Sequence, residues 1–237
     1  MSRKSLAPFV FVLAISGSWA AAKPRLNRSA KKASPLDEPI VAELRPVYPD
    51  IATAFQSVMP ANVPGGVATS EGCVVHPRKP LHVTGATLRQ ALDSIVTEDP
   101  QYRWVVDRGV TDLVPTDGPP PLLKTKFGEV EINNPADVWR SSARLFSLPI
   151  VLEARAQLGL SIRGTLSAGP PPNLRPLPTL RLDDGSVFRG LNALMRANGG
   201  GIWMYDQRSC HGAGDYSLNF WNVPVKLNRP TASESAP

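Results

Sequence analysis

Histidine, cysteine and the common catalytic motifs are scarce in this sequence. Its 237 residues include three histidines and two cysteines, and neither G-x-S-x-G nor H-E-x-x-H occurs. A hydrolase needs a nucleophile, a base and an orienting group within reach of one another, and the sequence singles out no such set. A glycosidase carboxylate pair cannot be chosen among its 20 acidic residues either. We therefore predict no catalytic residue, no metal ligand and no cofactor, and expect that the protein is not an enzyme.

Acidic residues are absent from the first 33 positions. Those positions hold seven of the chain's 26 lysines and arginines, which leaves 19 basic residues against 20 acidic ones in the remainder. A nucleic-acid groove needs several clustered cations to neutralise phosphates. Because the remainder is close to neutral, we predict that the protein does not bind nucleic acid.

Long apolar runs are also rare. The run Leu6–Ile15 is too short to span a membrane, which takes roughly 20 residues. Two basic residues precede it and alanines at 20–22 follow it, as in a cleaved export signal. We predict a signal peptide over 1–22, export to the periplasm or alternatively secretion, and no transmembrane segment in the mature chain. Residues 23–34 are basic and almost without large apolar side chains, which predicts a disordered lead-in.

The two cysteines, Cys73 and Cys210, lie far apart in the sequence. In an oxidising compartment, two cysteines of an exported chain favour one disulfide, and two free thiols are the rival prediction. Zinc binding is a further alternative, because His76 follows Cys73 at C-x-x-H spacing and His211 is adjacent to Cys210. Adjacent ligands are poorly placed to meet at one tetrahedral ion, so the disulfide is favoured.

The stretch 81–115 is echoed from Leu180 onward, at an offset that pairs Trp104 with Trp203 without a gap. Each copy has an alternating run typical of a strand, then a helix with one apolar stripe, then two more strands. We predict an α+β fold with two β-α-β-β units. The two units either form separate helix-on-sheet layers or share one core.

Both predicted helices begin at a hydroxyl residue. Thr87 is followed by Gln90 at the spacing of a capping box, whereas Ser186 is followed by Arg189, which cannot complete one. The apolar stripes fall at i, i+3, i+4, i+7 and i+8. They consist of Leu88, Ala91, Leu92, Ile95 and Val96 in the first copy and of Val187, Gly190, Leu191, Leu194 and Met195 in the second.

Each copy closes with a predicted hairpin. In the first copy, Trp104–Val106 and Val110–Val114 flank a tight turn. In the second, 202–205 and 216–221 flank a longer connection that holds 209–212.

The sequence also predicts whether two tryptophans and one histidine are buried or exposed. We expect Trp104 and Trp203 to fill the space between helix and sheet, as large aromatic side chains do, with ligand stacking as the alternative. His82 alternates with Leu81 and Val83, so we expect it to face solvent.

Further elements are predicted around the repeats. Asp50 is expected to cap a helix over 51–59, residues 67–69 and 73–75 to form a hairpin, and Asn134-Pro135 to start a helix.

The predicted order is a signal peptide (1–22), a basic lead-in (23–34), a first α+β unit (35–115), a proline-rich linker (116–126), a strand with a helical middle segment (127–167), a second proline-rich linker (168–178), a second α+β unit (179–228) and a disordered tail (229–237).

A strand, a helix beginning T-L-R-Q-A-L at Thr87 and the aromatic Trp104 on the next strand form one pattern, which 187–192 and Trp203 repeat more loosely. The pattern resembles the short N-terminal domain of secretins and TonB-dependent receptors, the STN domain. The resemblance implies a cell-envelope protein whose small α+β modules make protein–protein contacts. It transfers no catalytic or ligand residue. No pore or receptor role is expected, because the sequence shows no barrel or receptor portion.

We therefore expect an exported cell-envelope protein that acts as a protein-binding or assembly module, with an envelope protein as its partner. The first hairpin is expected to offer an exposed edge at Val110–Val114 to a partner strand. The alternative is an envelope or secreted enzyme acting on a polymer or a small substrate, which a cleft with a perturbed carboxylate or histidine would favour. A purely structural role is the third hypothesis.

Overall fold

The structure is a computed structural model that describes residues 34–40, 47–73, 80–163, 175–183 and 185–224. The predicted signal peptide, nearly all of the basic lead-in and the predicted tail lie outside these residues, as does most of the second proline-rich linker. Among the described helices, none has the length and apolar character needed to cross a membrane.

A six-stranded mixed sheet brings together strands from both repeats. Its members are β1 (Pro64–Glu71), β2 (Tyr102–Asp107), β3 (Val110–Pro115), β6 (Leu160–Ile162), β9 (Gly201–Cys210) and β10 (Ala213–Trp221). They are arranged in the order β2-β3-β1-β9-β10-β6. β1 pairs in parallel with β3 on one side and with β9 on the other, whereas β2–β3 and β9–β10 are antiparallel hairpins. The strand β6 pairs in parallel with β10.

Two short antiparallel pairs connect the middle of the chain to the second repeat. They are β4 (Lys126–Phe127) with β8 (Gly185–Ser186), and β5 (Val130–Ile132) with β7 (Leu180–Leu182). The second repeat is therefore held by the middle segment and is not a separate module.

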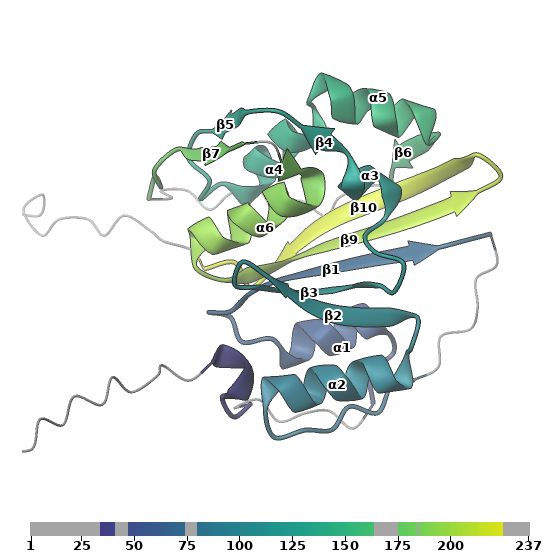
Figure 1. The fold of residues 1–237 in the computed structure, drawn as a ribbon, viewed down its shortest axis with the longest axis vertical. Helices are drawn as coiled ribbons and strands as arrows, with labels where there is room; N and C mark the ends of the chain where they lie inside the picture. Colours follow the sequence, from purple (N-terminus) through teal and green to yellow (C-terminus); the bar gives the residue numbers. More distant parts are fainter. Residues whose placement is uncertain (1–33, 41–46, 74–79, 164–174, 184, 225–237) are drawn as a thin grey trace, which may run out of the picture. The chain divides into compact units, whose positions relative to one another are not determined.

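Helices cover both faces of the sheet. They are η1 (Pro35–Asp37), α1 (Ile51–Val58), α2 (Leu88–Glu98), α3 (Pro121–Lys124), α4 (Val138–Phe146), α5 (Pro149–Gln157) and α6 (Val187–Asn198). Figure 1 shows α1 and α2 on one face and α4, α5 and α6 on the other. Each face has its own core, one around Phe55 and Ile95 and one around Leu191 and Trp203. β3 is buried at all six positions, as expected of a strand covered on both faces.

The predicted α+β fold is confirmed, and the two repeats share one sheet. They do not share one core, because α2 and α6 lie on opposite faces of that sheet. Trp203 is fully buried against α6, which confirms its predicted place in the core. Trp104 is only half-buried against α2, where its indole N–H donates to Asp93 at 2.8 Å.

The caps predicted at Thr87, Ser186 and Asp50 are confirmed. The Thr87 hydroxyl accepts from the Gln90 amide, and the Gln90 side chain accepts from the Thr87 amide, which completes the capping box of α2. Ser186 caps α6 without a box, and Asp50 caps α1 by accepting from the Thr53 amide at 2.8 Å. Both apolar stripes face their cores.

The predicted hairpin over 67–69 and 73–75 is wrong. Val67–Thr69 belong to the single strand β1, whose partners β3 and β9 come from distant parts of the chain. Val74 and Val75 lie outside the described residues. Leu81 is also not in a strand, because it makes only an isolated bridge with Tyr48. Parallel pairing between distant segments leaves no local turn signal in a sequence.

The second hairpin is longer and tighter than predicted. β9 continues to Cys210, and a two-residue turn at His211-Gly212 joins it to β10. Both turn residues have positive φ, 48° and 79°, as a tight hairpin turn requires. Residues 206–209 are polar, so the alternation of apolar residues did not predict the second half of the strand.

The segment 116–126 is not an extended linker. Pro121 occupies the first turn of α3, and Leu122 and Leu123 are fully buried. Proline at this position supports a helix start as well as an extended spacer. The helix predicted at Asn134-Pro135 instead begins at Val138 and is capped by Asp137.

Candidate binding groove

Two adjoining depressions lie along α6. The larger has a volume of about 620 Å³ and the smaller about 340 Å³, and both have Asp107, Gly185 and Arg189 in their walls. We call them together the cationic groove. Its basic residues are Lys124, Lys126, Arg108, Arg181, Arg189 and Arg196.

The buried end of α3 holds one wall of the groove in place. Leu122 and Leu123 anchor α3 in the core, and β4 then pairs with β8 so that Lys126 lies opposite Ser186. The amide of Val187 donates to the carbonyl of residue 125 at 3.1 Å. A segment more than fifty positions away in the sequence is thereby fixed against the start of α6.

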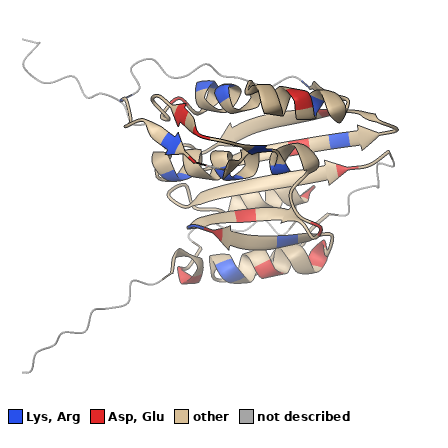
Figure 2. Ribbon diagram, turned by 45° about the horizontal axis from the view of Figure 1, so that its top comes forward, with Lys and Arg blue, Asp and Glu red and all other residues tan. Residues whose placement is uncertain are grey.

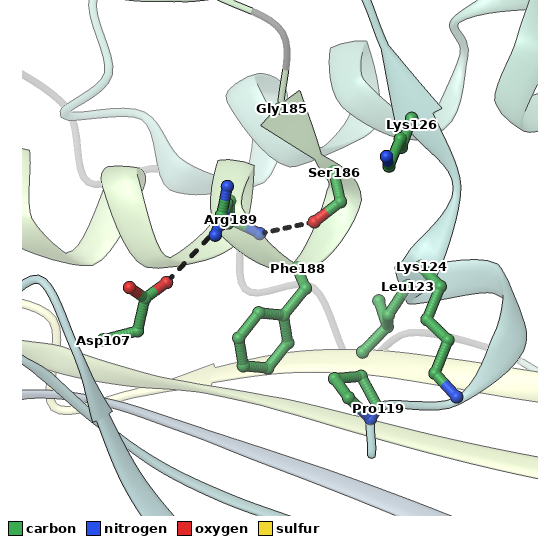
Figure 3. A pocket seen from close by; sticks show the side chains of 9 residues that line it. All are labelled: Asp107, Pro119, Leu123, Lys124, Lys126, Gly185, Ser186, Phe188 and Arg189. Atoms are coloured by element: carbon green, nitrogen blue, oxygen red, sulfur yellow. Dashed lines mark hydrogen bonds and ion pairs between the residues drawn. The ribbon is translucent and has the colours of Figure 1, made fainter.

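The charges of the groove are only partly compensated. Arg189 lies 3.7 Å from Asp107, and Arg181 pairs with Glu131 at 2.9 Å. Lys124 and Lys126 form no ion pair with any described residue. Figure 3 shows both lysines on one side of the larger depression, across from Arg189 and Asp107. Elsewhere, basic and acidic residues are interspersed over helices and strands (Figure 2).

Apolar side chains form part of the lining between these charges. Phe188 and Leu123 are buried members of the core that reach the larger depression, and Pro119 lies beside them (Figure 3). The volumes fall in the usual range of ligand pockets. Lysine ammonium groups above an apolar floor can hold an anionic group that is attached to an apolar one.

Comparisons with known proteins were made for the whole chain. No family model, curated protein or solved structure matches it. The resemblance to the STN domain therefore stays a prediction.

The sheet ends at β2 on one side and at β6 on the other, so the edge strand of the first hairpin is β2 and not the strand predicted for it. Val110–Val114 belong to β3, which lies between β2 and β1, so the predicted docking edge is wrong. Among the described residues, no strand pairs with the outer side of β2. Val106 on this strand is 48% exposed.

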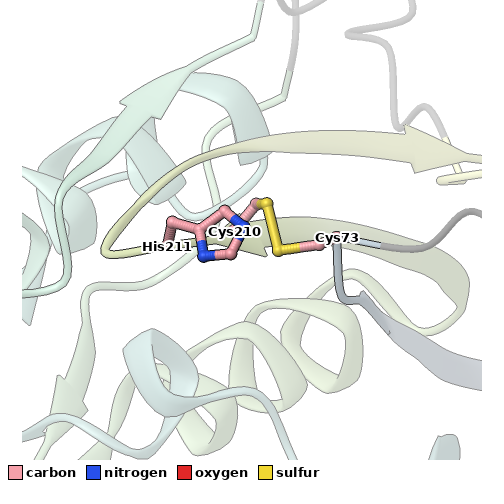
Figure 4. Close-up of side chains that lie close together, drawn as sticks. All are labelled: Cys73, Cys210 and His211. Carbon is pink, nitrogen blue, oxygen red and sulfur yellow. A yellow bond between two sulfur atoms is a disulfide. The ribbon is translucent and has the colours of Figure 1, made fainter.

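The predicted disulfide is present. Cys73 and Cys210 are bonded, with Cα atoms 4.6 Å apart, and join the segment after β1 to the end of β9. Figure 4 shows the imidazole of His211 beside the two sulfur atoms, and the three possible ligand atoms lie within 4.8 Å of one another. The bonded sulfurs are not thiolates, which is the form that binds zinc. His76 lies outside the described residues, and His82 is exposed as predicted.

Three buried side chains form a series of hydrogen bonds beneath α6. Asp112 in β3 accepts from the Asn192 side-chain amide at 2.6 Å, and Asn192 accepts from the indole N–H of Trp203 at 2.7 Å. Asp112 is fully buried, and this burial raises the pKa of its carboxyl well above the usual value, although the Asn192 hydrogen bond opposes the shift. The group packs against the core and lines neither depression of the groove.

Sequence reasoning missed the lysines of the groove. Lys124 and Lys126 fall in the segment interpreted as a linker, where charged side chains suggest only a solvated surface. The neighbouring Leu122, Leu123 and Phe127 were the available signal, because three large apolar residues so close together indicate an anchored segment.

Proposed function

We propose that this protein is an exported binding or assembly module of the cell envelope, and that it takes up an extended partner segment on the edge strand β2. The role is binding and not catalysis. The observation that carries the proposal is a six-residue edge strand whose outer side pairs with no strand among the described residues and on which Val106 is exposed. Such edges recruit a strand from another chain, and main-chain hydrogen bonds supply the affinity.

The backbone groups of β2 are arranged for this use. Asp107 and Val110 flank the two-residue turn of the hairpin, and residues in that position exchange hydrogen bonds with each other. Alternate residues then point away from β3, so the amides and carbonyls of Val106 and Trp104 face outward. The exposed Val106 side chain adds apolar contact area for an incoming strand.

Two further observations support the compartment and the role. The disulfide between Cys73 and Cys210 is compatible with export, because disulfides persist in oxidising compartments. The resemblance of the Thr87 helix and Trp104 to the STN domain supports a protein-binding role in the envelope.

The test replaces Val106 by proline. Proline removes the outward amide of an edge strand without removing a bond of the β2–β3 ladder. The tagged protein is crosslinked in cells and the envelope fraction is analysed by mass spectrometry. We expect a reproducible partner whose recovery falls by about tenfold in Val106→Pro, since a main-chain hydrogen bond and its neighbours are lost.

Val106→Thr is the matched control, because it keeps the β-branched shape and the amide. Circular dichroism and thermal unfolding of both variants establish that the fold is retained. Equal recovery of the partner with Val106→Pro would contradict the proposal, as would recovery of the wild-type protein as a soluble monomer without a partner.

A further inference from the structure

The cationic groove carries a charge excess that the described chain leaves uncompensated. Three acidic residues, Asp107, Asp183 and Glu131, stand against its six basic ones. The chain after residue 33 is close to neutral as a whole, so this excess is local. Lys124 and Lys126, on one side of the larger depression, contribute to it without an acidic partner among the described residues.

We propose that the cationic groove binds an acidic segment of a partner protein, with side-chain carboxylates at Lys124 and Lys126. The inference rests on the proposed function, since the segment belongs to the partner that docks on β2. Asp107 is both the last residue of β2 and a wall of both depressions. A chain added along β2 therefore reaches the groove where that strand ends.

The chemistry of the groove favours carboxylates on a flexible chain. Lysine ammonium groups act as point charges without a fixed bidentate geometry, and the Arg189 guanidinium already contacts Asp107 at 3.7 Å. The two depressions adjoin along α6, which suits an extended ligand more than a compact one. The floor at Phe188 accepts an apolar side chain beside an acidic one.

The lysines are exposed, and exposed ion pairs contribute little individually and are screened by salt. A single carboxylate would therefore bind weakly, and several acidic residues in series are needed. Binding must weaken steeply as the salt concentration rises.

The experiment measures fluorescence anisotropy of labelled hexaglutamate with the full chain, at low and at high salt. We expect saturable binding at low salt, none with labelled hexaglutamine, and an affinity about tenfold lower in the double variant Lys124→Glu/Lys126→Glu, where two attractions become repulsions. The matched control is Arg140→Glu/Arg144→Glu, which reverses two exposed charges on α4 outside the groove. It should retain the wild-type affinity.

Three outcomes would overturn the inference. Equal losses in the two double variants would mean attraction by net charge and not by the groove. Absence of hexaglutamate binding would reject the acidic segment outright. Binding of inorganic pyrophosphate in the groove with no hexaglutamate binding would assign the site to a phosphate ligand instead.

Val106→Pro separates this inference from the proposed function. Hexaglutamate binding should be unchanged in that variant, because the peptide needs only the groove. If Val106→Pro loses the partner and hexaglutamate does not bind, docking on β2 is supported and the acidic ligand of the groove is rejected. If Val106→Pro retains the partner and hexaglutamate binds in the groove, the groove is supported and docking on β2 is rejected.

Discussion

Asp112 shows how one buried residue makes the stability of the fold depend on pH. Among the described residues, its carboxyl has one hydrogen-bond partner, Asn192, and its other oxygen is buried without one. Burial is the largest cause of its raised pKa, and the nearby Asp107 raises it further, while Asn192 and Arg196 lower it. The native state therefore holds the proton to a higher pH than the unfolded chain does.

This shift predicts the direction of a pH effect. Between the unfolded and the folded pKa of Asp112, the native state binds more protons, so stability falls as pH rises through that window. Asp112→Asn keeps the shape and removes the ionisation. We expect it to match the wild type at low pH and to gain on the order of 1 kcal/mol at pH 8. Urea unfolding at both pH values measures the difference.

A loss of stability in Asp112→Asn that is equal at both pH values would contradict this account. The sequence could not predict the site, since an aspartate within a V-T-D-L-V run is equally typical of an exposed strand position. Its partner Asn192, and Trp203 which donates to Asn192, come from the second repeat and become its neighbours only when β1 joins the two hairpins.

At the level of single elements, local signals and distant pairings differ in how well they can be predicted. The helices α1, α2 and α6 follow from capping residues and apolar stripes that lie within one segment. The first hairpin follows from Arg108-Gly109, which take the positive φ values of a tight turn. The neighbours of β1 could not be predicted, because its parallel partners lie far along the chain and leave no local signal.

The close packing of β1 against the neighbouring strands requires glycine at position 66. A Cβ at Gly66 would lie 2.2 Å from the Trp203 ring and 2.4 Å from Asp112. We expect Gly66→Ala to destabilise the protein by about 2 to 3 kcal/mol through overpacking, measured by chemical denaturation. Gly72→Ala is the control, since a Cβ there meets no atom within 4 Å. Similar effects of the two variants would contradict the packing argument.

Across the whole molecule, the shared sheet joins the two repeats, and the disulfide joins the segment after β1 to the second of them. β9 pairs with β1 over eight residues, and the Cys73–Cys210 bond follows directly beyond that ladder. The sequence predicted the bond from the compartment and the cysteine count, and predicted two units from the repeat. It could not predict that their helices lie on opposite faces, because both apolar stripes are equally compatible with either face.

Removing the disulfide should destabilise the fold without abolishing it. The bond closes a sequence separation of 137 residues, and loss of such a constraint on the unfolded chain costs on the order of 4 kcal/mol. Cys73→Ser/Cys210→Ser should retain native circular dichroism, since the β1–β9 ladder remains, and should unfold at lower denaturant concentration. An unchanged midpoint would show that the bond does not constrain the unfolded chain as described.

The most direct test of the central claim is hydrogen–deuterium exchange of β2 in the complex with the captured partner. If the partner adds a strand to this edge, the outward amides of Trp104 and Val106 should become protected, while the inward amide of Val105, already in the β2–β3 ladder, should change little. Unchanged exchange at Trp104 and Val106, with new protection confined to other elements, would contradict the claim that β2 is the docking edge.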